Sequence, residues 1–187
     1  GVVAVPALRT GVAESKAGNR LDKIRELVRA AHDFSQRARC LREIVFVVQR
    51  GAEDFQVELD RLSAPRLPQV RVRLGDITQV PSQGLVTAIN SEGMWGGGVD
   101  RAIQAVAGGQ FHRLAQVLLG KPDLSTLVAL SQRPHAGAFA NVVFVIDDLR
   151  LPLFDVLLAA LRAADRAGLR AVTVPAMRMG VMMQLGG

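Results

Sequence analysis

Three polar side chains, Asp76, Asn90 and Asp100, have the types and the spacing that a site for a phosphate-bearing ligand requires. Asp76 lies in the turn Gly75–Thr78 after one apolar run, and Asn90 directly follows another. Glycines and a valine at Gly96–Val99 then lead into a helical pattern that begins near Asp100. Glycines before a helix let the backbone approach an anion closely, and the helix dipole favours a phosphate there. The order of these residues therefore predicts one composite site.

Each of the three polar residues also has a structural alternative. An aspartate such as Asp76 forms turns, and an asparagine such as Asn90 caps or turns the end of a strand. An acidic residue such as Asp100 in the first turn of a helix complements the helix dipole. Cys40 is the single cysteine and the three histidines are scattered, so no metal-ligand spacing is present. We expect neither a metal nor a cofactor.

Taken in order, these motifs resemble the macro domain family, which binds ADP-ribose. The family pattern is a GDIT-like turn, an NAAN segment and a GGGGVD run that opens a helix. Here the corresponding segments are GDIT at Gly75–Thr78, TAIN at Thr87–Asn90 and WGGGVDRAI at Trp95–Ile103. A later family segment, similar to FPAISTGVYG, corresponds to VPAMRMGV at Val174–Val181. The resemblance implies a three-layer α/β/α fold, in which helices flank a mixed sheet.

The resemblance also implies roles for individual residues. Asp76 would accept a hydrogen bond from the adenine amine, and Ile77 would offer a backbone contact. Asn90 would contact the distal ribose, and Asp100 would act on a water near that ribose, as in the hydrolytic branch of the family. Asn90 and Asp100 are therefore the catalytic candidates. The residues implied to line the diphosphate and the distal ribose are Gly96, Gly97, Gly98 and Val99.

The strand that carries the second phosphate loop occurs twice. Residues 2–12 read VVAVPALRTGV and residues 171–181 read AVTVPAMRMGV, with identical residues at seven of the eleven positions. A macro-like sheet has one place for this strand. The N-terminal copy matches the family better and precedes a long helix, so it is the expected ligand loop; a crossover from the helix at Leu153–Ala164 favours the C-terminal copy instead. The loop residues implied to cradle the diphosphate are Arg9, Thr10, Gly11 and Val12.

The order of the segments departs from the family. Residues 1–62 resemble the C-terminal part of a macro domain, residues 63–68 form a proline-rich linker, and residues 69–187 resemble its N-terminal and middle part. We expect one macro-like domain in permuted order, and a junction between two tandem domains is the alternative. Thr87 replaces the first asparagine of NAAN, and Trp95 replaces a glycine. These departures favour a non-catalytic ADP-ribose reader or a degenerate module, so hydrolysis stays open.

Apolar periodicity predicts alternating strands and helices, and therefore a sheet with helices on both faces. The helix at 21–31 has a clear apolar stripe, and the run Ile44–Val48 is typical of a strand buried on both faces. The other expected strands are Val2–Val5, Val70–Leu74, Leu85–Ile89, Ser125–Ser131, Asn141–Ile146 and Ala171–Val174. The other expected helices are Ala52–Leu62, Val99–Val106, Phe111–Leu119 and Leu153–Ala164.

Composition limits the classes of partner. The 187 residues are 49% hydrophobic and 21% charged, which is ordinary for a globular domain. No apolar run reaches the ~18 residues of a membrane span, so we expect no membrane partner. The single cysteine, Cys40, allows no disulfide within the chain, so a reducing cytoplasm is the expected compartment. The net charge of +6 invites a basic RNA-binding module, but one Trp and no Tyr leave few base-stacking platforms. The expected partners are ADP-ribose or an ADP-ribosylated protein, with weak poly(ADP-ribose) or RNA binding as the lesser expectation.

Overall fold

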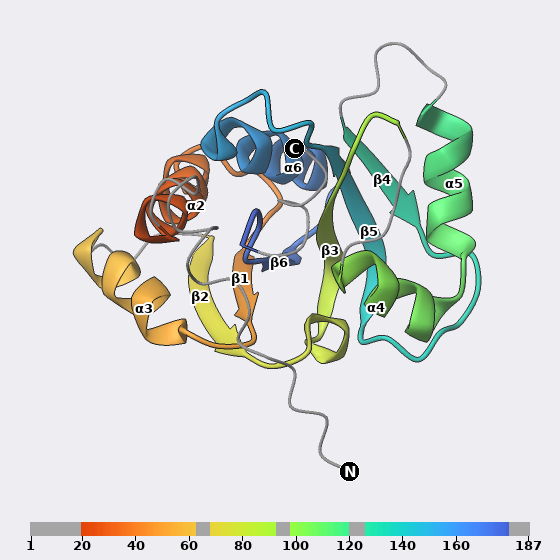
Figure 1. Cartoon of the computed structure of the whole chain (residues 1–187), viewed down its shortest axis with the longest axis horizontal. Helices are drawn as coiled ribbons and strands as arrows, with labels where there is room; N and C mark the ends of the chain where they lie inside the picture. The colour runs from red at the N-terminus through yellow and green to blue at the C-terminus, as the bar shows by residue number, and fades with distance from the viewer. Residues whose placement is uncertain (1–19, 63–67, 93–97, 120–125, 180–187) are drawn as a thin grey trace, which may run out of the picture.

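The computed structural model describes residues 20–62, 68–92, 98–119 and 126–179 of the chain. Its strands form a six-stranded sheet in the order β2-β1-β6-β3-β5-β4 (Figure 1). The strands are β1 (Glu43–Val48), β2 (Gln69–Leu74), β3 (Ser82–Ile89), β4 (Thr126–Leu130), β5 (Phe139–Ile146) and β6 (Ala171–Pro175). The helices are α2 (Arg20–Ser35), α3 (Ala52–Arg61), α4 (Gly98–Ala107), α5 (Gln110–Leu119) and α6 (Leu153–Arg166), with a short 3-10 helix η1 at Ile77–Gln79.

The sheet is mixed, as the sequence predicted. The neighbours from β2 to β5 all pair in parallel, and β4 pairs antiparallel with β5. Antiparallel strands can be joined closely, whereas each parallel pair needs a crossover, and the helices between the strands supply most of these. The strand β1 precedes the predicted linker in the sequence, yet it lies between β2 and β6, which both follow the linker. Segments from both sides of residues 63–68 therefore share one sheet.

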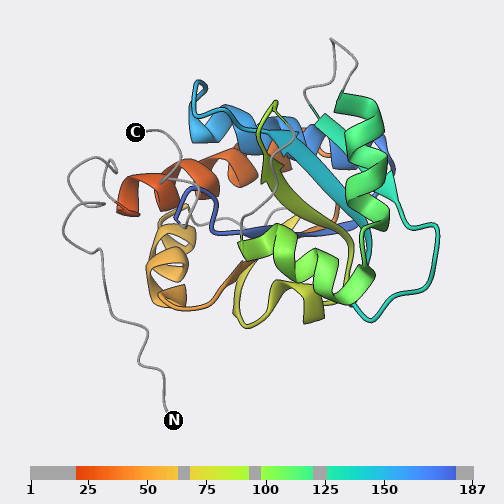
Figure 2. The same ribbon diagram turned by 45° about the vertical axis from the view of Figure 1, so that its right-hand side comes forward.

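Helices cover both faces of the sheet, which confirms the three-layer α/β/α architecture (Figures 1 and 2). Side chains of β1 alternate between two apolar cores, as the two-residue period of a strand requires. Ile44, Phe46 and Val48 face the helices α2, α3 and α6, in what we call the α2/α6 core. Val45 and Val47 face α4 and α5, in the α4/α5 core.

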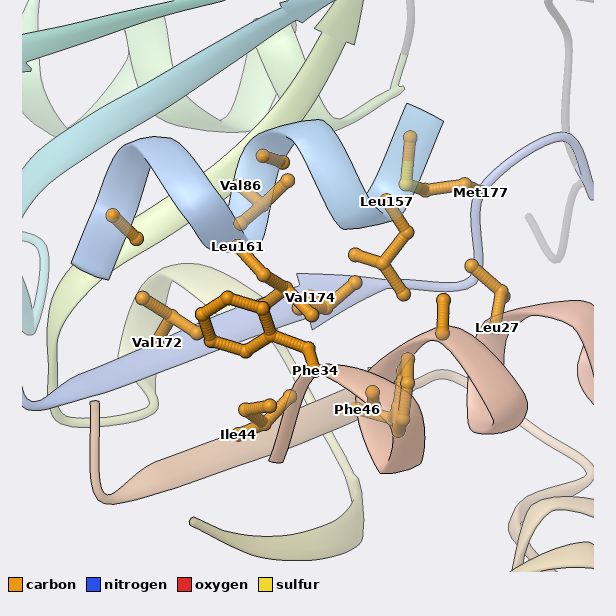
Figure 3. Packing of buried hydrophobic residues seen from close by; sticks show 14 of the residues in the cluster. Leu27, Phe34, Ile44, Phe46, Val86, Leu157, Leu161, Val172, Val174 and Met177 are labelled. Atoms are coloured by element: carbon orange, nitrogen blue, oxygen red, sulfur yellow. The ribbon is translucent and has the colours of Figure 1, made fainter. Parts of the chain in front are cut away.

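The α2/α6 core explains why the helices on this face form where they do. Leu27 and Phe34 lie seven residues apart on one stripe of α2, and Leu157 and Leu161 lie four apart on α6, so each helix presents one apolar side. Figure 3 shows these side chains meeting above β1 and β6. The helix α6 ends at Arg166, and Gly168 follows its C-cap with a φ of 77°, in the left-handed region that glycine adopts without cost.

The central position of the sheet corrects one expectation from the sequence. The C-terminal copy of the duplicated strand, β6, lies between β1 and β3 and pairs with both. The preference for the N-terminal copy in this position was therefore wrong, and the crossover from α6 to β6 is the physical reason. The helix α6 packs on the same face of the sheet as α2, and it leads the chain directly to the position between β1 and β3. Residues 2–12 lie outside the described residues.

The remaining elements expected within the described residues are all present, with bounds shifted by a few residues. The edge strand β2 exposes Arg71 and Arg73 and half-buries Val70 and Val72, which matches the predicted alternation. In the parts of the chain that the structure describes, no helix has both the length and the apolar character that crossing a bilayer requires.

Candidate functional site

A crevice for a ligand is expected where the strands β3 and β5 end. The two strands are parallel neighbours, yet the chain leaves β3 for α4 in one layer and leaves β5 for α6 in the other. Ligands of open α/β sheets bind at such a point, outside the carboxyl ends of strands whose connections diverge to opposite faces. The loops that follow β3, β5 and β6 meet at this edge. Of the described candidate residues, Asn90 lies in the loop after β3, and Gly98, Val99 and Asp100 begin the helix α4 that follows this loop.

Asn90 is held at this edge by the backbone on either side of it. The Asp147 N–H donates to the Ile89 carbonyl at 2.7 Å, and the Ser91 N–H donates to Asp148 Oδ1 at 2.8 Å. These two bonds join the end of β3 to the loop after β5. Asn90 lies between them and is half-buried. The structure therefore fixes its backbone at the end of β3, where the crevice is expected.

Gly98 and Val99 open α4 on the other side of the same loop. A Cβ built on Gly98 would meet no described atom within 4 Å, so this glycine faces open space. Val99 is half-buried and packs against the α4/α5 core. The first turn of a helix presents backbone N–H groups without helical partners, which suits a phosphate. Gly96 and Gly97 lie outside the described residues.

Asp100 is buried, so its carboxylate is not exposed at this edge of the sheet. Its residue exposure is 4%, and its Oδ1 accepts a hydrogen bond from Thr87 Oγ1 at 2.9 Å. His112 Nε2, on α5, lies 3.6 Å from the same oxygen. The carboxylate therefore ties α4 to β3 and α5, and Thr87, the residue that departs from the NAAN pattern, supplies one of its contacts.

Asp76 forms the turn before η1, as its structural alternative predicted. Its Oδ1 accepts hydrogen bonds from the Thr78 N–H at 2.9 Å and from Thr78 Oγ1 at 2.8 Å. Ile77 is buried in the α4/α5 core, and η1 contacts α4. Asp76 itself is exposed, so a ligand can approach this residue and its second carboxylate oxygen.

The loop after β6 is fixed to the loop after β5 by a buried ion pair. Arg178 Nε and Nη2 lie 2.9 and 2.6 Å from the two oxygens of Asp147, and Nη2 also donates to the Leu151 carbonyl at 2.7 Å. The side chains of Arg178 and Asp147 are 13% and 1% exposed. A planar guanidinium in this two-pronged arrangement is both strong and directional. Because β3 lies between β6 and β5, this pair crosses the end of β3.

Backbone strain accompanies that ion pair. Arg178 and Leu149 have positive φ angles of 57° and 60°, which non-glycine residues rarely adopt. The Leu149 N–H donates to Asp147 Oδ1 at 3.0 Å, and Lys23 Nζ donates to the Arg178 carbonyl at 2.9 Å. Burial and the nearby Arg178 charge lower the pKa of Lys23, against an opposing effect of Glu26. Such strain persists where the surroundings fix the backbone, and it concentrates at functional sites.

The structure thus brings together the end of β3, where Asn90 lies, and the loops after β5 and β6, and sequence reasoning missed the residue that joins them. Asp147 was not a candidate, because no motif marks it. A usable signal was the pair Asp147-Asp148 directly after the buried strand β5, at the edge where ligands bind. The loop residues Arg9, Thr10, Gly11 and Val12 lie outside the described residues.

A separate hollow of about 190 Å³ lies at the start of α5. It is lined by Gln110, Arg113, Leu114, Gln132 and Arg133. Gln110 joins the two sides, since its Oε1 accepts hydrogen bonds from the Gln132 and Arg133 N–H groups at 3.1 and 3.2 Å. None of the candidate residues lines this hollow, and we place the site at the sheet edge on the geometry of the loops. The described residues contain no cluster of His, Cys, Asp and Glu suited to a metal ion.

Comparison with known proteins gives one distant relative. An uncharacterized protein from Aeropyrum pernix is 32% identical over 119 residues, which are 59% of this chain and 60% of the relative. The chain thus spans about three-fifths of the length of that relative. No family model matches the chain, and no solved structure matches it.

Proposed function

We propose that this chain binds ADP-ribose through the edge of the sheet where β3, β5 and β6 end. The observation that supports this best is that Asn90 lies at the end of β3, where the connections to α4 and α6 diverge, while Gly98 begins α4 with open space beside it. The two residues come from the TAIN and WGGGVD segments, which the macro-like pattern assigns to the distal ribose and the diphosphate. The three-layer fold that this pattern implies is also the fold of the chain.

The position of Asp100 favours recognition without hydrolysis. A general base must reach the water that it activates, within hydrogen-bond distance of a plausible ligand. The Asp100 carboxylate is instead buried, and it accepts the Thr87 hydroxyl and faces His112. We therefore propose a non-catalytic reader of ADP-ribose or of ADP-ribosylated proteins. In an assay with an ADP-ribosylated protein, the unaltered chain should leave the linkage intact.

The partners follow from the same proposal. ADP-ribose carries two phosphates, and the chain has a net charge of +6, which favours anionic ligands. A cytoplasmic protein that displays ADP-ribose on its surface is the partner we propose, and poly(ADP-ribose) or RNA is a weaker one. For RNA only the charge gives support, since the aromatic side chains are few.

Gly98 offers a sharp test of the site. A methyl group added there meets no described atom and needs no left-handed backbone, so Gly98→Ala should leave thermal stability unchanged or slightly raised. The same methyl group would stand where a diphosphate approaches α4. Calorimetry should therefore show a loss of ADP-ribose affinity of about tenfold, or about 1.4 kcal/mol.

Two further variants complete that test. Asn90→Ala removes the side chain proposed for the distal ribose and should also weaken binding. Gln56→Ala, on the exposed side of α3, serves as the matched control and should bind as the unaltered chain does. Equal affinities in all four proteins would reject the proposed site.

A further inference from the structure

We propose that the central place in the sheet, now held by β6, accepts residues 2–6 of the same chain as an alternative strand. This inference does not depend on the proposed function. It starts from the repeat, in which residues 2–12 align with residues 171–181 without a gap. The structure adds what each position of the strand must satisfy, and the N-terminal copy can be compared with those requirements one by one.

The side chains that β6 buries have equivalents in the N-terminal copy. Val172 and Val174 are completely buried in the α2/α6 core, between Leu157, Leu161 and Phe34 (Figure 3). The aligned residues are Val3 and Val5, which are identical in type. Met177, which is buried in the same core, aligns with Leu8, and exchange of Leu for Met conserves volume in a packed core.

The end of the strand is also reproduced. Pro175 closes β6 opposite Val47, and Pro6 stands at the same place in the other copy. Arg178 aligns with Arg9, so either copy brings one arginine to the Asp147 carboxylate. A random apolar segment would fill the core and leave that buried carboxylate without its partner, which is costly.

Besides the crossover from α6, one difference between the two copies favours β6 as the resident strand. Thr173 points to the opposite face from Val172 and Val174, and its Oγ1 lies 3.3 Å from Ser82 Oγ. The aligned residue is Ala4, which cannot make this hydrogen bond and fills less space. The N-terminal copy is thus a close second occupant, and it takes the place when β6 is removed or disabled.

The connections of the fold accept the exchange. The chain passes from β1 through α3 to β2, and from β5 through α6 to β6. In the sheet order both connections run in the direction of β2, and both helices lie on the same face of the sheet. A step from residues 2–6 through α2 to β1 runs in the same direction, with α2 on that face. It therefore has the same hand, as parallel crossovers in one sheet nearly always do.

The length of chain between the strand and α2 also suffices. Lys23, in the first turn of α2, donates to the Arg178 carbonyl at 2.9 Å, so the place of Arg178 adjoins the start of that helix. In the exchanged form Arg9 would occupy this place, and fourteen steps of chain would separate it from Lys23. Such a length spans many times the distance observed, so the strand can come from the same molecule.

A matched pair of substitutions tests the exchange in the full chain. Val174→Asp puts a charge into the α2/α6 core and should expel β6, while Val5→Asp does the same to the alternative strand. Each single variant should keep one cooperative thermal transition and a monomeric mass by light scattering. The double variant should lose the transition. Loss of the transition in Val174→Asp alone, or its survival in the double variant, would overturn the proposal.

Deletion provides a second measurement in case the aspartate disturbs folding by itself. A chain that ends at Arg170 lacks β6 entirely and should still melt cooperatively as a monomer, with slow amide exchange retained in β1 and β3. Adding Val5→Asp to that shortened chain should abolish both properties. A folded dimer would show that the strand comes from a second copy, and an unfolded chain would show that no substitute exists; either result contradicts exchange within one molecule.

Discussion

The buried contact between Thr87 and Asp100 allows a prediction about a single hydroxyl group. Thr87→Val keeps the shape of the side chain but removes the donor that lies 2.9 Å from Asp100 Oδ1. A buried carboxylate that loses a hydrogen bond retains its desolvation cost without that compensation. We expect the free energy of unfolding, measured by urea denaturation, to fall by about 1–3 kcal/mol.

Thr126 provides the matched control for this substitution. Its Oγ1 is also buried, but among the described residues it has no hydrogen-bond partner. Thr126→Val should therefore leave the free energy of unfolding unchanged or raise it. If both variants lose the same stability, the contact with Asp100 contributes nothing of its own.

At the level of residues, sequence reasoning found candidate positions of the site but not the side-chain contacts that fix the loops around them. Asn90 and Gly98 carry motif information, so local patterns in the sequence are enough to mark them. Asp147 carries none, because its role depends on Arg178, which is 31 residues away in the sequence. A contact of this kind follows from strand order, which local patterns do not encode. Asp100 shows the reverse case, since the motif marked it and the fold buries it.

Among the elements, the end of α6 is joined to the connection between α2 and β1 by one carboxylate. Asp165 accepts hydrogen bonds from the backbone N–H groups of Arg39, Cys40 and Leu41, at distances between 2.7 and 3.1 Å. Burial acts to raise the pKa of Asp165, but these hydrogen bonds and the Arg39 charge outweigh it and lower the pKa below 3.8. The carboxylate thus stabilises the folded state in its charged form.

This shift gives Asp165→Asn a pH-dependent effect. A carboxyl group whose pKa is lower in the folded chain stabilises it above the unfolded pKa and loses that effect as pH falls through the folded value. The unaltered chain should therefore be more stable than the variant at pH 7, by about 1–3 kcal/mol. The gap should begin to narrow below about pH 5, where the unfolded carboxyl starts to take up a proton, and should narrow further as pH falls toward the folded pKa.

The control for this prediction lies on the same helix. Asp155 is exposed in the first turn of α6, and Asp155→Asn should have a smaller effect on the free energy of unfolding. Urea denaturation of both variants between pH 3 and pH 7 makes the comparison, and a gap for Asp165→Asn that widens toward acid would contradict the assignment.

The elements themselves were well predicted, because most of them bury one continuous stripe or run of apolar side chains. The strand β1 is buried along nearly its whole length, and α6 shows a clean helical stripe, so each period is unambiguous. Which copy of the repeat enters the sheet was not predictable in this way. Val172 and Val174 have the same types as Val3 and Val5, and the choice depends on the crossover from α6.

For the whole molecule, the interleaved sheet predicts that neither side of the linker folds alone. β1, from the first part, lies between β2 and β6, from the second, and pairs with both. Fragments 1–62 and 69–187 should each lack a cooperative thermal transition, since their sheet neighbours and the α2/α6 core would be missing. Mixing them should restore the transition. A fragment 69–187 that melts cooperatively by itself would contradict a single permuted domain.

Titration of the unaltered chain with ADP-ribose is the most direct test of the proposed function. We expect a saturable heat of binding and a rise in melting temperature, because a ligand that binds only the folded state stabilises it. Free ribose at the same concentration should produce neither effect, since it lacks the diphosphate and the adenine. No heat and no thermal shift at millimolar ADP-ribose would contradict the proposal that this chain recognises ADP-ribose.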